Sequence, residues 1–327
     1  MLKLNLIFAC TVLLLTGCQS MSSVQQNNKT TSIVNHNLED AREVSNQIDF
    51  RKNKKDSKKP IVALVLGSGG ARGYAHIGAI EILEQNHIYP DFIVGTSAGS
   101  IVGSLYASGK NAAELREIAL NLKANDVRDV TIDRKGFFEG QKVENFMNEQ
   151  VNNTPLQALK IPMYVVATEL KEGKRVVFNY GNTGQAVRAS VAIPSMFIPT
   201  KIGDDEYVDG GLVSPVPVEI AKELGADIII AVDILAQPVY TETSNVWGLF
   251  NQNINIMQKQ LAHEELKEAD IIIKPDLREK VHIFDVSGRE QTMLAGQDAT
   301  SDIIPKLKKL IDTYPLAKKS DRFTVKE

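Results

Sequence analysis

The chain has 327 residues, of which 43% are hydrophobic and 24% charged, a composition typical of globular rather than disordered or fibrous proteins. Its 37 basic and 40 acidic residues give a formal net charge of -3, so no overall basic field favours nucleic-acid binding. The two cysteines, Cys10 and Cys18, lie at the extreme N-terminus, and the five histidines are scattered. These counts disfavour an internal disulfide framework and a Cys/His zinc site, and we expect neither a metal nor a cofactor.

The N-terminus has the pattern of an export signal. Lys3 supplies a positive charge, and the apolar run over residues 4–15 is too short to span a bilayer of about 30 Å as a helix. The residues LTGC at positions 15–18 follow directly and resemble a bacterial lipoprotein signal, in which Cys18 is lipidated and becomes the mature N-terminus. An ordinary signal peptide with an incidental cysteine is the alternative. We therefore expect a signal peptide over residues 1–17.

Lipidation of Cys18 would anchor the protein to a membrane of the bacterial cell envelope. Gln19 follows the cysteine, and the absence of aspartate at this position favours the outer membrane. Residues 18–59 are mostly polar and predict a flexible linker, with a short helix over residues 38–50. A basic run over residues 51–59 ends this stretch; it is expected to be solvated, and attraction to anionic lipid headgroups is the alternative.

From Pro60 onward, apolar runs alternate with segments of helical pattern, which predicts an α/β fold with a mostly parallel sheet. A first domain is expected over residues 60–235. The expected strands are residues 61–66, 91–94, 163–168, 175–178, 206–208 and 228–232, and the expected helices are 74–85, 98–108, 112–123, 142–150, 184–190 and 217–224. A C-terminal α/β extension packed on this domain is expected over residues 236–327, with helices at 246–267 and 296–311 around a strand at 270–274.

A glycine loop, GSGGARG at residues 67–73, lies between the first predicted strand and the first predicted helix. Glycines at this place let backbone N–H groups approach a phosphate or an oxyanion closely. The loop is a poor dinucleotide fingerprint, because Ser68 stands where the first glycine would be, and it lacks the Gly-Lys-Ser/Thr of a P-loop. A tight turn without a ligand is the alternative.

A second motif, Gly95-Thr96-Ser97-Ala98-Gly99, has the pattern G-x-S-x-G between a predicted strand and a predicted helix. This is the context of a nucleophile elbow, whose sharp turn projects the serine hydroxyl from the edge of the sheet. The flanking glycines relieve crowding, and the N–H of Ala98 lies at a helix N-terminus, where it can donate to a developing oxyanion. Ser97 is therefore the candidate nucleophile.

A serine nucleophile needs a base, and Asp209-Gly210-Gly211 follows a short predicted strand. His263 and His282 are the histidines that follow in chain order, but neither lies in a pattern typical of a catalytic loop. Asp209 is therefore the candidate base, with the two glycines permitting close approach; a simple β-turn is the alternative.

The three motifs together, in this order, resemble the patatin-like phospholipase family, and most closely its bacterial branch related to neuropathy target esterase. The resemblance runs over residues 61–233 and includes RASVAIPSMF at 188–197 and GGLVSPVP at 210–217. It implies a three-layer α/β/α sandwich. It also implies hydrolysis of acyl esters, typically of phospholipids or lysophospholipids, by a Ser–Asp dyad without histidine or metal.

Carried onto this sequence, the resemblance makes Ser97 the nucleophile, Asp209 the general base, and Gly69, Gly70 and Arg72 the oxyanion hole. Ser68 departs from the family, many members of which carry glycine there. The expected function is thus a membrane-anchored serine acyl hydrolase. A non-catalytic binding or scaffold lipoprotein and a nucleotide-dependent dehydrogenase are the alternatives, and the imperfect glycine fingerprint disfavours the latter.

Two further features have competing interpretations. His76 is expected to pack or hydrogen-bond inside the fold rather than to shuttle protons. Val246, Trp247, Leu249 and Phe250 form an apolar cluster, expected to pack on the core, with a lipid-facing lip near the site as the alternative.

Overall fold

The computed structural model describes residues 38–44, 49–53, 59–131, 133–235, 244, 246–277 and 288–314. All of them belong to one compact unit over residues 34–327. The expected signal peptide, Cys18, His282 and the side chain of Trp247 lie outside what is described. Within the described ranges, no helix has both the length and the apolar character needed to cross a membrane.

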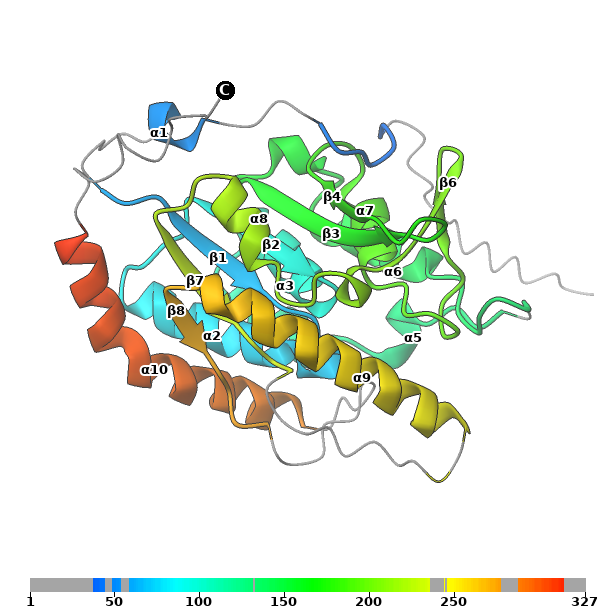
Figure 1. Ribbon diagram of the computed structural model, residues 1–327. Coiled ribbons are helices and arrows are strands. Elements are labelled where there is room, and N and C mark those ends of the chain that lie inside the picture. The colour runs from blue at the N-terminus through cyan, green and yellow to red at the C-terminus, as the bar shows by residue number, and fades with distance from the viewer. Residues whose placement is uncertain are drawn as a thin grey trace, which may run out of the picture. The chain divides into compact units, whose positions relative to one another are not determined.

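An eight-stranded mixed sheet lies at the centre (Figure 1). Its order is β5 (Thr200–Ile202), β6 (Asp205–Asp209), β3 (Met163–Glu169), β2 (Phe92–Thr96), β1 (Val62–Leu66), β7 (Ile228–Val232) and β8 (Ile271–Ile273), while β4 (Arg175–Phe178) pairs with β3 off this path. The neighbouring pairs β3–β2, β2–β1, β1–β7 and β7–β8 are parallel. The pairs β3–β4, β3–β6 and β5–β6 are antiparallel. The predicted α/β fold with a mostly parallel sheet is confirmed.

The apolar runs become strands because both faces of the sheet are covered. In β1, Leu64 and Leu66 face one hydrophobic cluster, whereas Ala63 and Val65 face a second cluster on the opposite side. Such burial on both faces is the reason that β1, β2 and β7 read as continuous apolar segments rather than as alternating ones.

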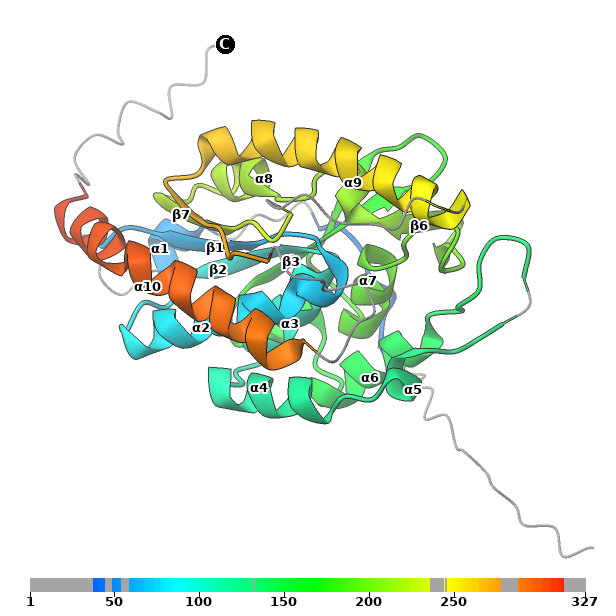
Figure 2. The same ribbon diagram turned by 90° about the horizontal axis from the view of Figure 1, so that it is seen from below.

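Helices form a layer on each side of the sheet (Figure 2), as in a three-layer α/β/α sandwich. One layer contains α2 (Tyr74–Gln85), α3 (Ala98–Ala107), α4 (Ala112–Asn121), α6 (Gln141–Gln150), α7 (Thr183–Ser190) and α10 (Arg289–Thr313). The other contains α8 (Val218–Glu223) and α9 (Val246–Glu265), with the short α1 (Phe50–Asn53) also on this side. The four-residue α5 (Ala124–Val127) precedes α6.

The helix α10 starts at Arg289 rather than at residue 296, where the sequence predicts it. Two of the contacts between α10 and α2 require glycine. A Cβ at Gly296 would lie 2.1 Å from the carbonyl oxygen of Ala75, and one at Gly78 would lie 1.9 Å from that of Met293. Gly296 is therefore a point of close backbone approach inside the helix rather than its first residue. The pairing packs α10 closely against α2.

The predicted free linker and the helix over residues 38–50 are wrong for the residues that the structure describes there. Residues 38–44 contain no helix. Ala41 is buried, with its N–H donating to Gln185 Oε1 at 2.7 Å, and Arg42 forms a β-bridge with Tyr180. Phe50 opens α1 and stacks on Phe92 with ring centroids 4.4 Å apart. A few apolar side chains in a polar stretch suffice to bind it to the domain.

Candidate active site

The sheet register brings Ser97 and Asp209 together. Strand β2 ends at Thr96, paired in parallel with Val166 of β3, and β6 ends at Asp209, paired antiparallel with Ala167 of β3. Strand β4 pairs with these same β3 residues, so it takes the other edge of β3. Strands β2 and β6 therefore lie end to end along one edge of β3, and the residues at their ends meet although 112 positions separate them in the sequence.

The turn at Ser97 has the strained geometry of an elbow. Ser97 has φ 53° and ψ −118°, a conformation that residues with a Cβ rarely adopt. Its neighbours must be glycine for steric reasons: a Cβ at Gly99 would lie 2.0 Å from the carbonyl oxygen of Leu66, and one at Gly95 would lie 2.6 Å from that of Gly99. The motif thus fixes a tight strand-to-helix turn that presents the Ser97 hydroxyl at the carboxyl end of the sheet.

Ser97 Oγ donates a hydrogen bond of 2.6 Å to Asp209 Oδ2. The other carboxylate oxygen, Oδ1, accepts from the N–H of Gly211 at 2.7 Å, and both Ser97 and Asp209 are buried. Burial raises the pKa of the Asp209 carboxyl to about 6, against the lowering effect of the two hydrogen bonds that it accepts. At neutral pH the carboxylate is ionised and is placed to accept the serine proton.

Neither His76 nor His263 is a hydrogen-bond partner of Ser97 or Asp209. His263 is exposed on α9. His76 is buried, and its Nε2 donates to the carbonyl oxygen of Gly67 at 2.8 Å, while burial lowers the pKa of its imidazole to about 4. His76 is thus a neutral, hydrogen-bonding residue beneath the glycine loop.

The glycine loop faces the same hydroxyl, since Gly70 and Ser97 line the same two cavities. The carbonyl oxygen of Gly69 accepts both the N–H of Arg72, at 3.3 Å, and the Nε of its side chain, at 3.0 Å. The Arg72 amide is therefore engaged within the loop. The N–H groups of Gly69 and Gly70 have no hydrogen-bond partner among the described residues, which leaves them available to an oxyanion.

Ser190 is a site residue that the sequence patterns did not single out. Its Oγ accepts the N–H of Ser97 at 2.8 Å and donates to the carbonyl oxygen of Val166 at 2.6 Å. One hydroxyl thereby links the elbow to the strand beside it. Ser190 is the last residue of α7, so the position of that helix sets the position of the elbow.

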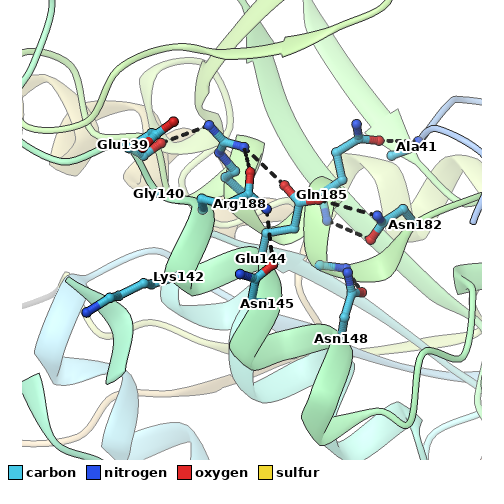
Figure 3. A network of polar contacts seen from close by, with 12 residues as sticks. Ala41, Glu139, Gly140, Lys142, Glu144, Asn145, Asn148, Asn182, Gln185 and Arg188 are labelled. Atoms are coloured by element: carbon cyan, nitrogen blue, oxygen red, sulfur yellow. Dashed lines mark hydrogen bonds and ion pairs between the residues drawn. The ribbon is translucent and has the colours of Figure 1, made fainter. Parts of the chain in front are cut away.

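A polar network ties α7 to α6 (Figure 3). Arg188 donates to Glu144 at 3.1 Å, to the side chain of Gln141 at 2.8 Å and to the carbonyl oxygen of Glu139 at 2.9 Å. At the other end of α7, Asn148 accepts the N–H of Gly184 at 2.8 Å. The bonds of Arg188 to Glu144 and Gln141 are partly buried, and the bond between Asn148 and Gly184 is buried. Together they fix both ends of the helix that carries Ser190.

The segment 214–216 joins the elbow and the glycine loop. Thr96 Oγ1 donates to the carbonyl oxygen of Ser214 at 2.9 Å, and the N–H of Ser68 donates to that of Pro215 at 2.8 Å. The segment is held in turn by Glu265 at the end of α9, which accepts the Ser214 hydroxyl and, at 2.8 Å, the N–H of Val216. No sequence motif indicates Glu265, because its role depends on how α9 packs against the segment 214–216.

An apolar cavity of about 220 Å³ opens beside Ser97. Its wall comes from α2, α3, α4, α6 and the segment after α7, and it includes Ile77, Ile101, Leu105, Leu115, Ile118, Ala119, Met147 and Phe197. Ser97 also lines a second, more polar pocket of about 40 Å³. Ser68, Arg72, Asp209 and three residues of α9 line it. The described side chains include no group of three His, Cys, Asp or Glu residues arranged to bind a metal.

Comparison with known proteins adds an independent finding. The sequence profile described as patatin-like phospholipase matches residues 64–222. An uncharacterized NTE family protein of Mycobacterium tuberculosis is 36% identical over 181 residues, which covers 54% of this chain and 50% of that protein. The chain therefore spans about half the length of this relative.

Two relatives that match over a smaller share of their length carry more informative names. Patatin-like phospholipase domain-containing protein 6 of Mus musculus is 29% identical over 207 residues, covering 59% of this chain and 15% of that protein. Lysophospholipase NTE1 of Coccidioides immitis is 30% identical over 203 residues, covering 58% and 13%. Among solved structures, VipD of Legionella pneumophila matches with a TM-score of 0.44 and 14% identity, covering 85% of this chain and 70% of VipD. That likeness is too weak to support an argument.

Proposed function

Residues 64–222 form a domain of the patatin-like phospholipase family, and from this premise we propose that the protein hydrolyses acyl esters of lipids. The observation that carries the proposal is the 2.6 Å hydrogen bond from Ser97 Oγ to Asp209 Oδ2 at the mouth of an apolar cavity. A hydroxyl paired with a buried carboxylate is a nucleophile with its base, and an apolar cavity beside it suits a fatty acyl chain.

In the first half of the reaction, Asp209 accepts the proton of Ser97 Oγ as the oxygen forms a bond to the ester carbonyl carbon. Negative charge develops on the carbonyl oxygen, and in this proposal the N–H groups of Gly69, Gly70 and Ala98 donate to it. Each donor of this kind is worth about 3 kcal/mol in well-studied hydrolases. The intermediate then collapses: the ester C–O bond breaks, the leaving oxygen takes the proton from Asp209, and an acyl-enzyme remains.

In the second half, Asp209 accepts a proton from a water molecule whose oxygen attacks the acyl carbon. The bond to Ser97 Oγ breaks, the proton returns to Oγ, and the fatty acid leaves. Neither half requires a histidine. The pKa of Asp209, about 6, keeps this single base ionised at the start of each half and able to donate once protonated.

The two cavities differ in polarity, as do the acyl chain and the alcohol portion of a lipid ester. The acyl chain lies in the 220 Å³ cavity, whose lining side chains are nearly all apolar. The alcohol portion of the ester leaves through the polar pocket lined by Ser68, Arg72 and Asn255. The proposal includes tethering through a lipidated Cys18, which rests on the sequence pattern at residues 15–18 and places the enzyme at the membrane that holds its substrate.

The experiment uses the chain from residue 19, which contains the whole compact unit over residues 34–327. Hydrolysis of short and long p-nitrophenyl esters and of a mixed phospholipid panel is measured for the wild type and for Ser97→Ala and Asp209→Asn. Circular dichroism establishes that each variant is folded. Loss of activity in both variants supports the proposal. Full activity in folded Ser97→Ala contradicts it, and folded wild type that cleaves no ester favours a binding or scaffold role.

A further inference from the structure

The helix α9 has two different faces. Its inner face lines the polar pocket beside Ser97 and Asp209 through Ile254, Asn255 and Gln258. Ala262 is buried in the second hydrophobic cluster. It lies two residues before the Glu264–Glu265 pair that ends the helix. One side of α9 therefore belongs to the wall of the candidate active site.

The outer face of α9 is apolar and exposed. It presents Val246, Leu249, Ile256, Met257 and Leu261, which recur at spacings of three, seven, one and four residues. At 100° per residue these positions fall within an arc of about 140°. The arc also contains Asn253 and Gln260, and the pocket-lining residue Ile254 lies at its edge. A water-facing helix surface normally carries charged side chains, so an apolar stripe of this length marks a contact surface.

The charges on α9 indicate what kind of surface meets it. Residues 246–258 contain no charged side chain, and the charged residues of α9, together with His263, lie in its last two turns: Lys259, Glu264 and Glu265. The polar residues between the apolar ones are asparagine and glutamine. The uncharged part of such a helix enters a headgroup layer without desolvating a carboxylate or being repelled by anionic lipid. This complementarity fits a bilayer surface.

A second exposed apolar group flanks the other cavity. Val130 and Phe137 are exposed on the loop between α5 and α6. In the same loop, Phe138 packs on Phe197, with ring centroids 5.5 Å apart, and Phe197 lines the apolar cavity. This loop and the beginning of α9 lie at the same end of the sheet in both Figure 1 and Figure 2. Apolar side chains thus border both cavities at the mouth of the site.

We propose that the outer face of α9, together with Val130 and Phe137, docks on the surface of a lipid bilayer. The inference rests on the proposed function, because docking in this way presents the mouth of both cavities to membrane lipids. The expected anchor permits it, because Cys18 precedes Leu38 by 20 residues, and an extended stretch of that length reaches about 65 Å. Anchor and docking face can therefore contact one membrane together.

The test measures binding separately from hydrolysis. The chain from residue 19 is sedimented with vesicles of ether-linked phosphatidylglycerol and phosphatidylcholine, which an ester hydrolase cannot cleave. The variant Leu249→Gln/Met257→Gln removes two side chains of α9 that are 53% and 56% exposed. Glutamine keeps the helix propensity of leucine and methionine. The matched control is Leu294→Gln, 51% exposed on α10 in the opposite helical layer.

We expect the wild type and the control to bind these vesicles alike and the double variant to partition at least ten-fold more weakly. All three proteins should hydrolyse p-nitrophenyl acetate, a soluble monomeric ester, at the same rate. Absence of vesicle binding by the wild type overturns the proposal, as does equal weakening by Leu294→Gln. So does a wild-type dimer that the double variant dissociates, because a second copy would then cover the face. Failure of the proposed function looks different: no protein cleaves the acetate, whatever its vesicle binding.

Discussion

Glu265 offers a sensitive test of how the site is held together, because it touches no reacting atom. Its carboxylate accepts the Ser214 hydroxyl and the Val216 N–H, on either side of Pro215. The carbonyls of Ser214 and Pro215 in turn accept donors from Thr96 and Ser68. Replacing Glu265 with alanine therefore loosens both the elbow and the glycine loop.

The size of the effect follows from these bonds. A hydrogen bond to an ionised group contributes about 1.5–3 kcal/mol, and alanine removes two of them. Part of this loss is offset by water, which can reach the position because Glu265 is only half-buried. The loss is also smaller because burial raises the pKa of the Glu265 carboxyl to about 7, so that the group is only partly ionised at neutral pH. We expect a net loss of about 2 kcal/mol of transition-state stabilisation, or roughly 30-fold in kcat. KM should change little, because Glu265 does not line either cavity.

The assay is steady-state hydrolysis of a soluble p-nitrophenyl ester by wild type, Glu265→Ala and Glu265→Gln. Glutamine still accepts the Val216 N–H, and the Ser214 hydroxyl can rotate to accept from its amide, so kcat should recover to within about three-fold of wild type. Glu268→Ala is the matched control, because Glu268 lies three residues on and forms only an exposed ion pair with Lys222. A folded Glu265→Ala variant with wild-type kcat, or equal losses in alanine and glutamine, would refute this reasoning.

Four further predictions follow from the same geometry. Because burial raises the pKa of Asp209 to about 6, kcat/KM should rise with pH through about 6 and fall at pH 5 to about one-tenth of its plateau; a flat profile from pH 5 to 8 would contradict Asp209 as the base. The same raised pKa means that wild type loses stability as pH rises from about 4 to 6, by on the order of 3 kcal/mol, and Asp209→Asn should remove this part of the slope in urea unfolding. Ser190→Ala leaves a buried N–H and a buried carbonyl unpaired, so the free energy of unfolding should fall by about 2–4 kcal/mol and kcat should fall with it; unchanged denaturation would show that Ser190 does not hold the elbow. Ala119→Phe places a ring in the acyl cavity and should lower kcat/KM for a dodecanoate ester at least ten-fold relative to acetate; an unchanged ratio would place the acyl chain elsewhere.

Much of the site could be predicted because its motifs act through local geometry. The glycines at 95 and 99 are required by the turn itself, so the pattern G-x-S-x-G between a strand and a helix indicates the elbow without knowledge of the fold. The strands were recognisable for a similar reason: β1 and β7 are buried on both faces and read as unbroken apolar runs. The three-layer arrangement follows from strands of this kind alternating with helices.

The remaining features depend on contacts between distant segments. Nothing local indicates that β2 and β6 meet end to end on β3, which is the arrangement that pairs Ser97 with Asp209. Ser190 lies in the family-like segment 188–197, but nothing in that segment indicates its hydrogen bond to the N–H of Ser97, and Glu265 acts on a backbone segment 49–51 residues away from it. The helix start at Gly296 was misplaced because a glycine that permits close approach of α2 looks like a helix boundary in the sequence. Ala41 and Phe50 are buried against the domain, but the mostly polar composition around them predicts a linker rather than such contacts.

The central claim is that Ser97 forms a covalent acyl-enzyme with Asp209 as its base. The most direct measurement is to mix the enzyme with a long-chain p-nitrophenyl ester, quench within milliseconds, and locate the acyl group by peptide mass spectrometry. The account predicts a burst of p-nitrophenol, an acyl adduct on Ser97, and loss of both in Asp209→Asn. An adduct on another residue, or steady hydrolysis by Ser97→Ala, would contradict it.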